Sequence, residues 1–213
     1  GTPFTAGDIE FWFEHVVRNP ELTPSLYNEL QPGGEAVTFE KLDDHTVRFT
    51  FAQPHGLFLK FVASQMWATA MVSTPAHYMK QFHPSGYPAA EAGMEVHPGL
   101  RKRMDEGGFR MWRDLFNEKA AWRNPDLPTL GAWVLKTPPP ALQIVGERNP
   151  YYWKVDPQGN QLPYIDRVTF DITGEETINL KAINGEIDAQ GRHLSPASYP
   201  LIMEKQQSGG YAV

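Results

Sequence analysis

The sequence lacks cysteine altogether, which excludes disulfide bonds, thiolate chemistry and cysteine-ligated zinc from its 213 residues. No apolar run approaches the roughly 18 to 20 residues that a membrane-spanning helix requires. Lysine and arginine form no run longer than the three residues Arg101-Lys102-Arg103, and the net charge is −6. These features argue against nucleic acid or an anionic membrane surface as a partner, and they favour a small or neutral ligand.

Motifs of common enzyme classes are missing as well. There is no GxSxG nucleophile elbow, no GxxxxGKS/T phosphate loop, no GxGxxG and no HExxH. The pair Asp43-Asp44 suits a hairpin corner, and Glu175-Glu176 suits the first turn of a helix. We therefore expect no enzymatic activity, no metal and no cofactor, with a glycosidase-like enzyme as a remote alternative.

The first part of the chain carries mainly helical signals. Thr5 is a typical helix N-cap, Asp8 completes a capping box, and apolar residues follow at helical spacing. Residues 36–54 alternate between apolar and polar about Asp43-Asp44, which predicts a hairpin with one solvent-facing side. Three further helices are predicted, a buried one at 56–64 and others at 74–82 and 109–122. The prolines and glycines of 83–108 predict an irregular surface excursion.

The last part follows a connector at 124–130 and has a different pattern. Strands are predicted at 132–137, 142–148, 167–172 and 187–190, helices at 175–184 and 196–207, and the start of a strand at 211–213. The βαβα order predicts a mixed or parallel sheet. Between the second and third strands, Asp156 to Asn160 predict a tight turn, and Tyr151 to Trp153 predict a packing slab.

Four stretches occur in a characteristic order, namely "TPFTAGDIEFWFEHV", "DDHTVRFTFAQP", "ERNPYYWKVDPQGNQLPYIDRV" and "AINGEIDA". This series resembles the extracellular solute-binding proteins of family 5, the peptide- and nickel-binding components of ABC importers. The resemblance runs from Thr2 to about Asp188, and the combination of RNPYYW, YID and GEID is specific.

The resemblance implies a mixed α/β (α+β) chain that is part of a type II periplasmic-binding-protein fold, in which two lobes close on a ligand. Residues 1–125 would form a helix-and-strand subdomain inserted in lobe one, and residues 126–213 would form part of lobe one. The second lobe would be absent, because family members are much longer, and the chain is expected to be an internal piece.

The resemblance also implies where the ligand binds. In peptide-binding members the residues after the aspartate of GEID line the cleft, which gives this role to Gln190, Gly191, Arg192 and His193. Peptide binders commonly have a Tyr-Asn pair where this chain has Gly191-Arg192, so the ligand class stays open. Arginine offers a fork of donors to a carboxylate or to sugar hydroxyls. Trp67 is a further candidate contact, since aromatic rings supply large contact area.

The expected function is that of the substrate-binding component of an ABC importer, which captures oligopeptides and delivers them to membrane permease subunits. The long "VDPQGNQLPYID" is similar to a subgroup that includes oligosaccharide binders, so an oligosaccharide is the alternative ligand. A sensor ectodomain is a remote alternative. We expect a monomer outside the cytoplasm, in the periplasm or at the cell surface, where a lipid anchor could hold the full-length parent.

Overall fold

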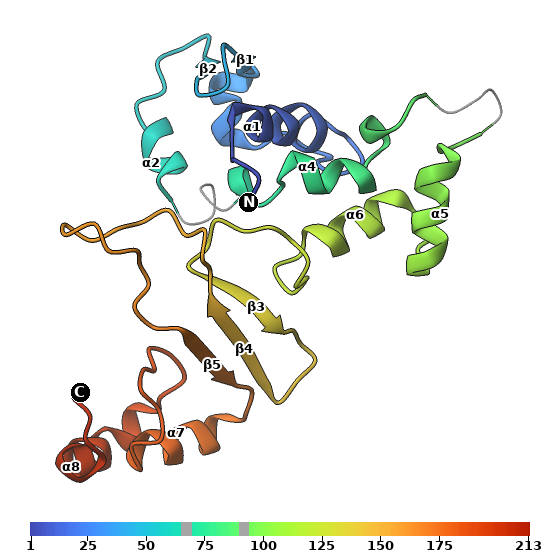
Figure 1. Cartoon of the computed structure of the whole chain (residues 1–213). Helices are drawn as coiled ribbons and strands as arrows, with labels where there is room; N and C mark the ends of the chain where they lie inside the picture. Colours follow the sequence, from blue (N-terminus) through green and yellow to red (C-terminus); the bar gives the residue numbers. More distant parts are fainter. Residues whose placement is uncertain (65–69, 90–93) are drawn as a thin grey trace.

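The computed structural model describes residues 1–64, 70–89 and 94–213. Figure 1 shows helices and a small hairpin gathered around α1, next to a three-stranded sheet that is followed by α7 and α8. Among the described residues no helix is both long and apolar enough to cross a membrane. The mixed α/β (α+β) composition agrees with the expected fold class.

The elements of the helical part are α1 Ala6–Trp12, η1 Phe13–Val17, η2 Asn28–Leu30, η3 Pro32–Gly34, β1 Thr38–Lys41, β2 Val47–Thr50, α2 Phe58–Val62, α4 Ala76–Met79, η4 Lys80–Phe82, η5 Pro84–Gly86, α5 Pro98–Gly107 and α6 Trp112–Ala120. Those of the sheet part are β3 Trp133–Thr137, β4 Gln143–Arg148, β5 Arg167–Asp171, α7 Glu175–Ile183, η6 Pro196–Ser198 and α8 Tyr199–Gly209.

Helix α1 begins at the predicted cap. The Thr5 hydroxyl accepts a hydrogen bond from the Gly7 amide at 3.2 Å, and the Asp8 carboxylate accepts one from the Thr5 amide at 2.8 Å. These bonds satisfy amides that have no partner inside the helix. The capping box predicted from the sequence is therefore confirmed.

The predicted hairpin is confirmed too, as the antiparallel pair of β1 and β2. Phe39 and Phe49 stand opposite each other on the face that contacts η1. Phe13 stacks on Phe39 with ring centroids 4.7 Å apart and meets Phe49 edge to face at 5.9 Å. This aromatic packing belongs to a first buried cluster that also contains Trp12, Val17, Leu30 and Val37.

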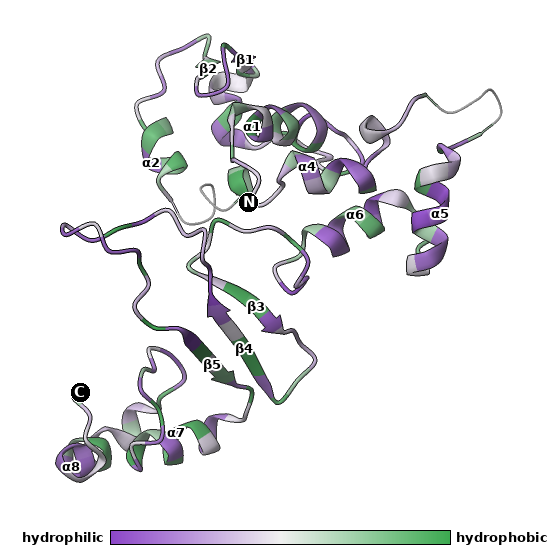
Figure 2. Ribbon diagram, in the orientation of Figure 1, coloured by the Kyte–Doolittle hydropathy of each residue, from purple (hydrophilic) through white to green (hydrophobic). Residues whose placement is uncertain are grey.

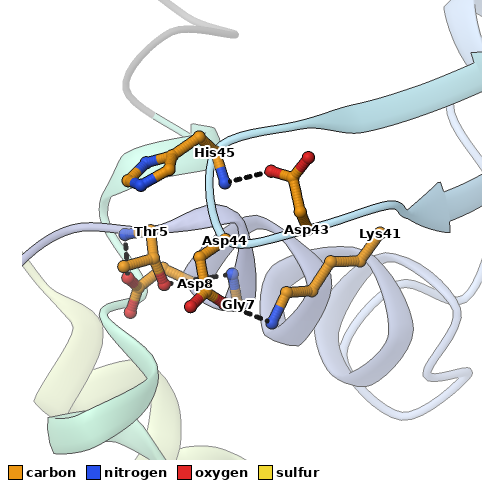
Figure 3. Close-up of polar contacts among 7 residues, drawn as sticks. All are labelled: Thr5, Gly7, Asp8, Lys41, Asp43, Asp44 and His45. Carbon is orange, nitrogen blue, oxygen red and sulfur yellow. Dashed lines mark hydrogen bonds and ion pairs between the residues drawn. The ribbon is translucent and has the colours of Figure 1, made fainter.

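Asp8 links this region to a distant segment of the chain. Its other carboxylate oxygen accepts a hydrogen bond from the Ala76 amide, at the start of α4, at 2.8 Å. The side chain is buried, with the residue 6% exposed. Nearby, the Ala6 amide donates to the Asp44 carbonyl at 2.9 Å, so the hairpin turn lies over the beginning of α1 (Figure 3). One short stretch therefore holds α1, α4 and the hairpin together.

A second buried cluster, in which α5 takes part, differs from the sequence prediction for this region. Its buried members are Phe11, Met79, Phe82, Leu100, Met104, Trp112, Leu115 and Phe116. Within the predicted irregular excursion at 83–108, residues Pro98–Gly107 instead form the regular helix α5, which has Pro98 in its first turn and buries Leu100 and Met104. Proline is tolerated at a helix start, where no intrahelical amide bond is lost. Gly108 ends the helix with a φ of 73°.

The predictions for α2 and α6 hold only in part. Helix α2 forms, but it is not buried: Leu59 is 79% exposed, and only Phe58 and Phe61 pack against the first cluster. Helix α6, predicted at 109–122, buries Leu115, whereas Trp122 lies beyond its end and is 67% exposed. Helical spacing alone did not reveal that the helix stops before Trp122.

The sheet differs most from its prediction. The three strands run in the order β3-β4-β5 with both pairs antiparallel, so a mixed or parallel sheet is wrong. Residues 187–190 and 211–213 form no strand. Gly185, with a φ of 71°, reverses the chain after α7, and the Tyr211 hydroxyl donates to the Ile202 carbonyl of α8 at 2.8 Å. An alternation of apolar and polar residues over only three or four positions was too short to predict which segments join the sheet.

His83 is a buried titratable group in the second cluster. It is 4% exposed and lies between Phe11, Trp112 and Phe116, with ring centroids within 5.8 Å. Burial, reinforced by the nearby charge of His15, lowers the pKa of His83 from 6.5 to about 4. The folded protein therefore favours the neutral imidazole.

We predict that Asp8→Ala lowers the free energy of unfolding by about 2–3 kcal/mol, because it leaves the Thr5 and Ala76 amides without their acceptor. Asp43→Ala is the matched control: Asp43 is exposed, and its carboxylate accepts a hydrogen bond from the His45 amide at 2.7 Å within the hairpin turn (Figure 3). It should cost less than about 1 kcal/mol. Urea unfolding measures both, and equal losses would contradict the role given to Asp8.

We also predict that stability falls as the pH drops from about 6.5 towards 4. In this range His83 becomes protonated in the unfolded chain but stays neutral in the folded protein. Because the unfolded state then binds more protons, lowering the pH favours unfolding. The loss should reach about 2 kcal/mol, and His83→Asn should flatten this part of the pH profile. The exposed-histidine variant His45→Asn should keep the slope. Thermal melts across the range check this, and an unchanged slope in His83→Asn would refute it.

Candidate ligand-binding site

A groove of about 1170 Å³ lies between the sheet and the loop that precedes it. Its walls are residues of β3, β4 and β5, where Figure 2 shows many hydrophobic positions, together with residues 127–131. Trp122, Trp133 and Trp153 contribute to the lining. Hence three of the six tryptophans surround one depression.

The chemistry of the groove is almost entirely apolar. No charged side chain lines it within the described part of the chain. Trp153 is 67% exposed and Phe170 is 59% exposed, so large apolar surfaces face the groove without cover. Such a surface can hold apolar side chains or the faces of sugar rings. It supplies few of the polar groups that would orient a charged ligand.

Asn149 shapes the loop that forms one wall of the groove. The residue is 3% exposed, and its amide nitrogen donates to the carbonyls of Thr129 and Gly131 at 3.1 and 2.9 Å. Its side-chain oxygen accepts from the Tyr151 amide at 3.0 Å, and its backbone amide donates to Ala132 at 2.9 Å. A single asparagine thus joins the loop before β3 to the segment after β4.

The turn predicted at 156–160 is confirmed. The Asp156 carboxylate accepts hydrogen bonds from the backbone amides of Gln158 and Asn160 at 2.9 and 2.8 Å. The Tyr164 hydroxyl, together with the Asn160 side chain, holds the pKa of Asp156 at about 2. The predicted packing slab is only partly right, since Tyr151 is 70% exposed and Tyr152 alone is partly buried.

The four residues that the resemblance placed at the ligand lie together in the loop between α7 and η6. Gln190, Gly191, Arg192 and His193 are all exposed. The loop is tied to α7 by Asn179, whose side chain contacts the His193 carbonyl and the Ser195 amide. None of these loop residues lines the groove. Trp67, the fifth candidate, lies outside the described residues.

Sequence reasoning therefore missed the tryptophan groove and Asn179. Trp122 was assigned to the predicted helix at 109–122 and Trp153 to a packing slab, because the spacing of apolar residues shows periodicity and does not show which face of an element is covered. Asn179 gave a weak signal, as an asparagine inside a helix pattern often bonds to backbone. Among the described residues, no three histidines or acidic residues are grouped to hold a metal ion.

Comparison with known proteins gives the family. Residues 1–210 match the model of the bacterial extracellular solute-binding proteins, family 5 (middle region). The chain belongs to this family. The relationship predicted from RNPYYW, YID and GEID is therefore confirmed.

Several family members and solved structures are similar over most of the chain. The periplasmic alpha-galactoside-binding protein of Rhizobium meliloti (strain 1021) is 31% identical over 191 residues, which cover 88% of this chain and 24% of that protein. A structure titled oligopeptide-binding protein OppA is 43% identical with a TM-score of 0.86, covering 100% of this chain and 32% of the other. The chain thus spans about a quarter to a third of the length of these relatives.

A third relative has been solved with a bound sugar. It is the periplasmic binding protein MelB of Agrobacterium fabrum C58, in complex with stachyose. It is 26% identical to this chain with a TM-score of 0.64, and the match covers 96% of this chain and 27% of the other. The relatives therefore include a protein named as oligopeptide-binding as well as proteins named as binding, or solved with, a saccharide.

We predict that Asn149→Ala destabilises the sheet part by about 2–3 kcal/mol. The substitution leaves the Tyr151 amide without its acceptor and removes the hydrogen bonds to the carbonyls of Thr129 and Gly131. Asn160→Ala, which removes one exposed side-chain bond to Asp156 at 2.8 Å, should cost less than about 1 kcal/mol. Hydrogen exchange of the 127–135 segment together with urea unfolding measures the difference. Similar effects of the two variants would show that Asn149 does not organise the groove.

Proposed function

We propose that this chain is part of the substrate-binding component of an ABC importer, which captures oligopeptides between two lobes and delivers them to membrane permease subunits. The observation that carries the proposal is the 43% identity, over the whole chain, to a structure titled oligopeptide-binding protein. Membership of the extracellular solute-binding family supports the same function. The protein would work outside the cytoplasm, as a monomer.

In this proposal residues 1–125 form an inserted subdomain and residues 126–213 form part of lobe one. Gln190, Gly191, Arg192 and His193 would face the ligand, with the Arg192 guanidinium as a donor to a carboxylate. Closure of the two lobes would select a buried complex that the permease recognises. This mechanism needs binding and a hinge but no covalent step.

A second candidate ligand is an oligosaccharide. It is favoured by the alpha-galactoside-binding relative and by the relative solved with stachyose. The tryptophans of the groove offer flat apolar faces of the kind that sugar rings stack on. The same arginine fork can donate to sugar hydroxyls.

Native mass spectrometry of the full-length parent, purified without unfolding, separates the two candidates. The expected result is a bound population whose extra masses are sums of amino-acid residues, because closed binding proteins retain ligand during purification. A ladder of hexose units would instead establish the oligosaccharide candidate. A sample unfolded, dialysed and refolded is the control and should lose the extra mass. Repeated absence of bound peptide or sugar, with no shift on adding either, would contradict the proposed function.

A further inference from the structure

The loop between α7 and η6 is held by one buried side chain. Within α7 the only buried residue is Asn179, which is 8% exposed. Its amide nitrogen donates to the Glu175 carbonyl of its own helix at 2.8 Å and to the His193 carbonyl at 3.4 Å, and its oxygen accepts from the Ser195 amide at 2.9 Å. The side chain therefore clamps the backbone on both sides of Leu194.

The backbone held by Asn179 has an unusual conformation at His193. His193 has a φ of 61°, and it is the only non-glycine residue with positive φ in the described part of the chain. A side-chain-bearing residue in this region is strained, and the conformation persists only where its surroundings enforce it. The Asn179 contact with the His193 carbonyl is such an enforcing interaction.

Arg192 directly precedes the strained residue and is available for a ligand. Its carbonyl accepts a hydrogen bond from the Gln190 side chain, so the peptide is fixed on this side as well. Its guanidinium makes no hydrogen bond or ion pair with the described residues. By contrast, Lys181 of α7 is paired with Asp171 at 2.6 Å.

We propose that Asn179 is a positioning residue: by holding the His193–Ser195 backbone against α7, it sets where the unpaired guanidinium of Arg192 meets a ligand carboxylate or hydroxyl. The proposal rests on the proposed function, because it takes the 190–193 loop as ligand-facing. A loop held in its binding conformation loses less freedom on binding than a mobile one, which strengthens affinity without a new contact. Asn179 itself does not touch the ligand.

The test is a double-mutant cycle in the full-length parent, with tetra-alanine and stachyose as probes in calorimetric titrations. Arg192→Ala should weaken the probe that binds by at least about tenfold. Asn179→Ala should weaken it by roughly three- to tenfold. In the Arg192→Ala background, however, Asn179→Ala should change the affinity by less than about twofold. A side chain with a merely structural role would weaken binding equally in both backgrounds.

Asn184→Ala is the matched control. Asn184 ends the same helix, is exposed and bonds to the Glu186 carboxylate at 3.1 Å, so its loss should leave affinity unchanged. An Asn179 effect that is equal in both backgrounds would overturn the proposal. So would an Arg192→Ala protein that binds its probe normally, although the proposed transport function would then still stand.

A second measurement needs no ligand. Trypsin cuts after Arg192, and Asn179→Ala should speed this cut several-fold by releasing the loop, whereas Asn184→Ala should not. If neither probe binds the unmodified protein, the native mass spectrum described above decides the proposed function, because one peptide and one sugar do not represent their classes. The proposal about Asn179 is then decided by cleavage, and equal rates in Asn179→Ala and the unmodified protein would overturn it.

Discussion

The buried carboxylate of Asp8 is the interaction on which the helical part depends. It accepts from an amide of its own cap and from the Ala76 amide, 68 residues away along the chain. This fixes the direction of α1, whose Phe11 enters one buried cluster while Trp12 enters the other. Neither cluster could keep its packing if α1 rotated or shifted at its first turn, because interiors are close-packed.

The sheet part is organised by a different device. Asn149 and Asn179 are both buried amides, and each ties a loop to a regular element by backbone hydrogen bonds. Helix α7 buries no apolar side chain, and one face of the sheet opens on the tryptophan groove. In this half of the chain polar clamps therefore hold the loops against the sheet and helix, while much of the apolar surface stays available for contact with other groups.

Local signals predicted local structure well. The Thr5 cap, the hairpin about Asp43-Asp44 and the turn at Asp156 all depend on residues within a few positions of one another, and all three are present. Helix α5 was missed because Pro98 resembles a loop signal when its place at a helix start is unknown. Strand direction was missed because it depends on how distant segments pair. For the site, the resemblance predicted a ligand-facing role for the loop around Arg192, which stays a prediction, and the clamp from Asn179 depends on a contact across 14 residues that local patterns do not show.

The groove and the 190–193 loop offer complementary chemistry. The groove presents apolar faces without charge, whereas the loop presents an arginine whose backbone is fixed and whose guanidinium is unpaired among the described residues. Oligopeptides and oligosaccharides both need polar groups that fix their orientation, and the apolar groove supplies few of them. In the proposed function, this orientation is assigned to the 190–193 loop. A change of loop residues, such as Gly191-Arg192 in place of a Tyr-Asn pair, could then alter ligand class without disturbing the sheet.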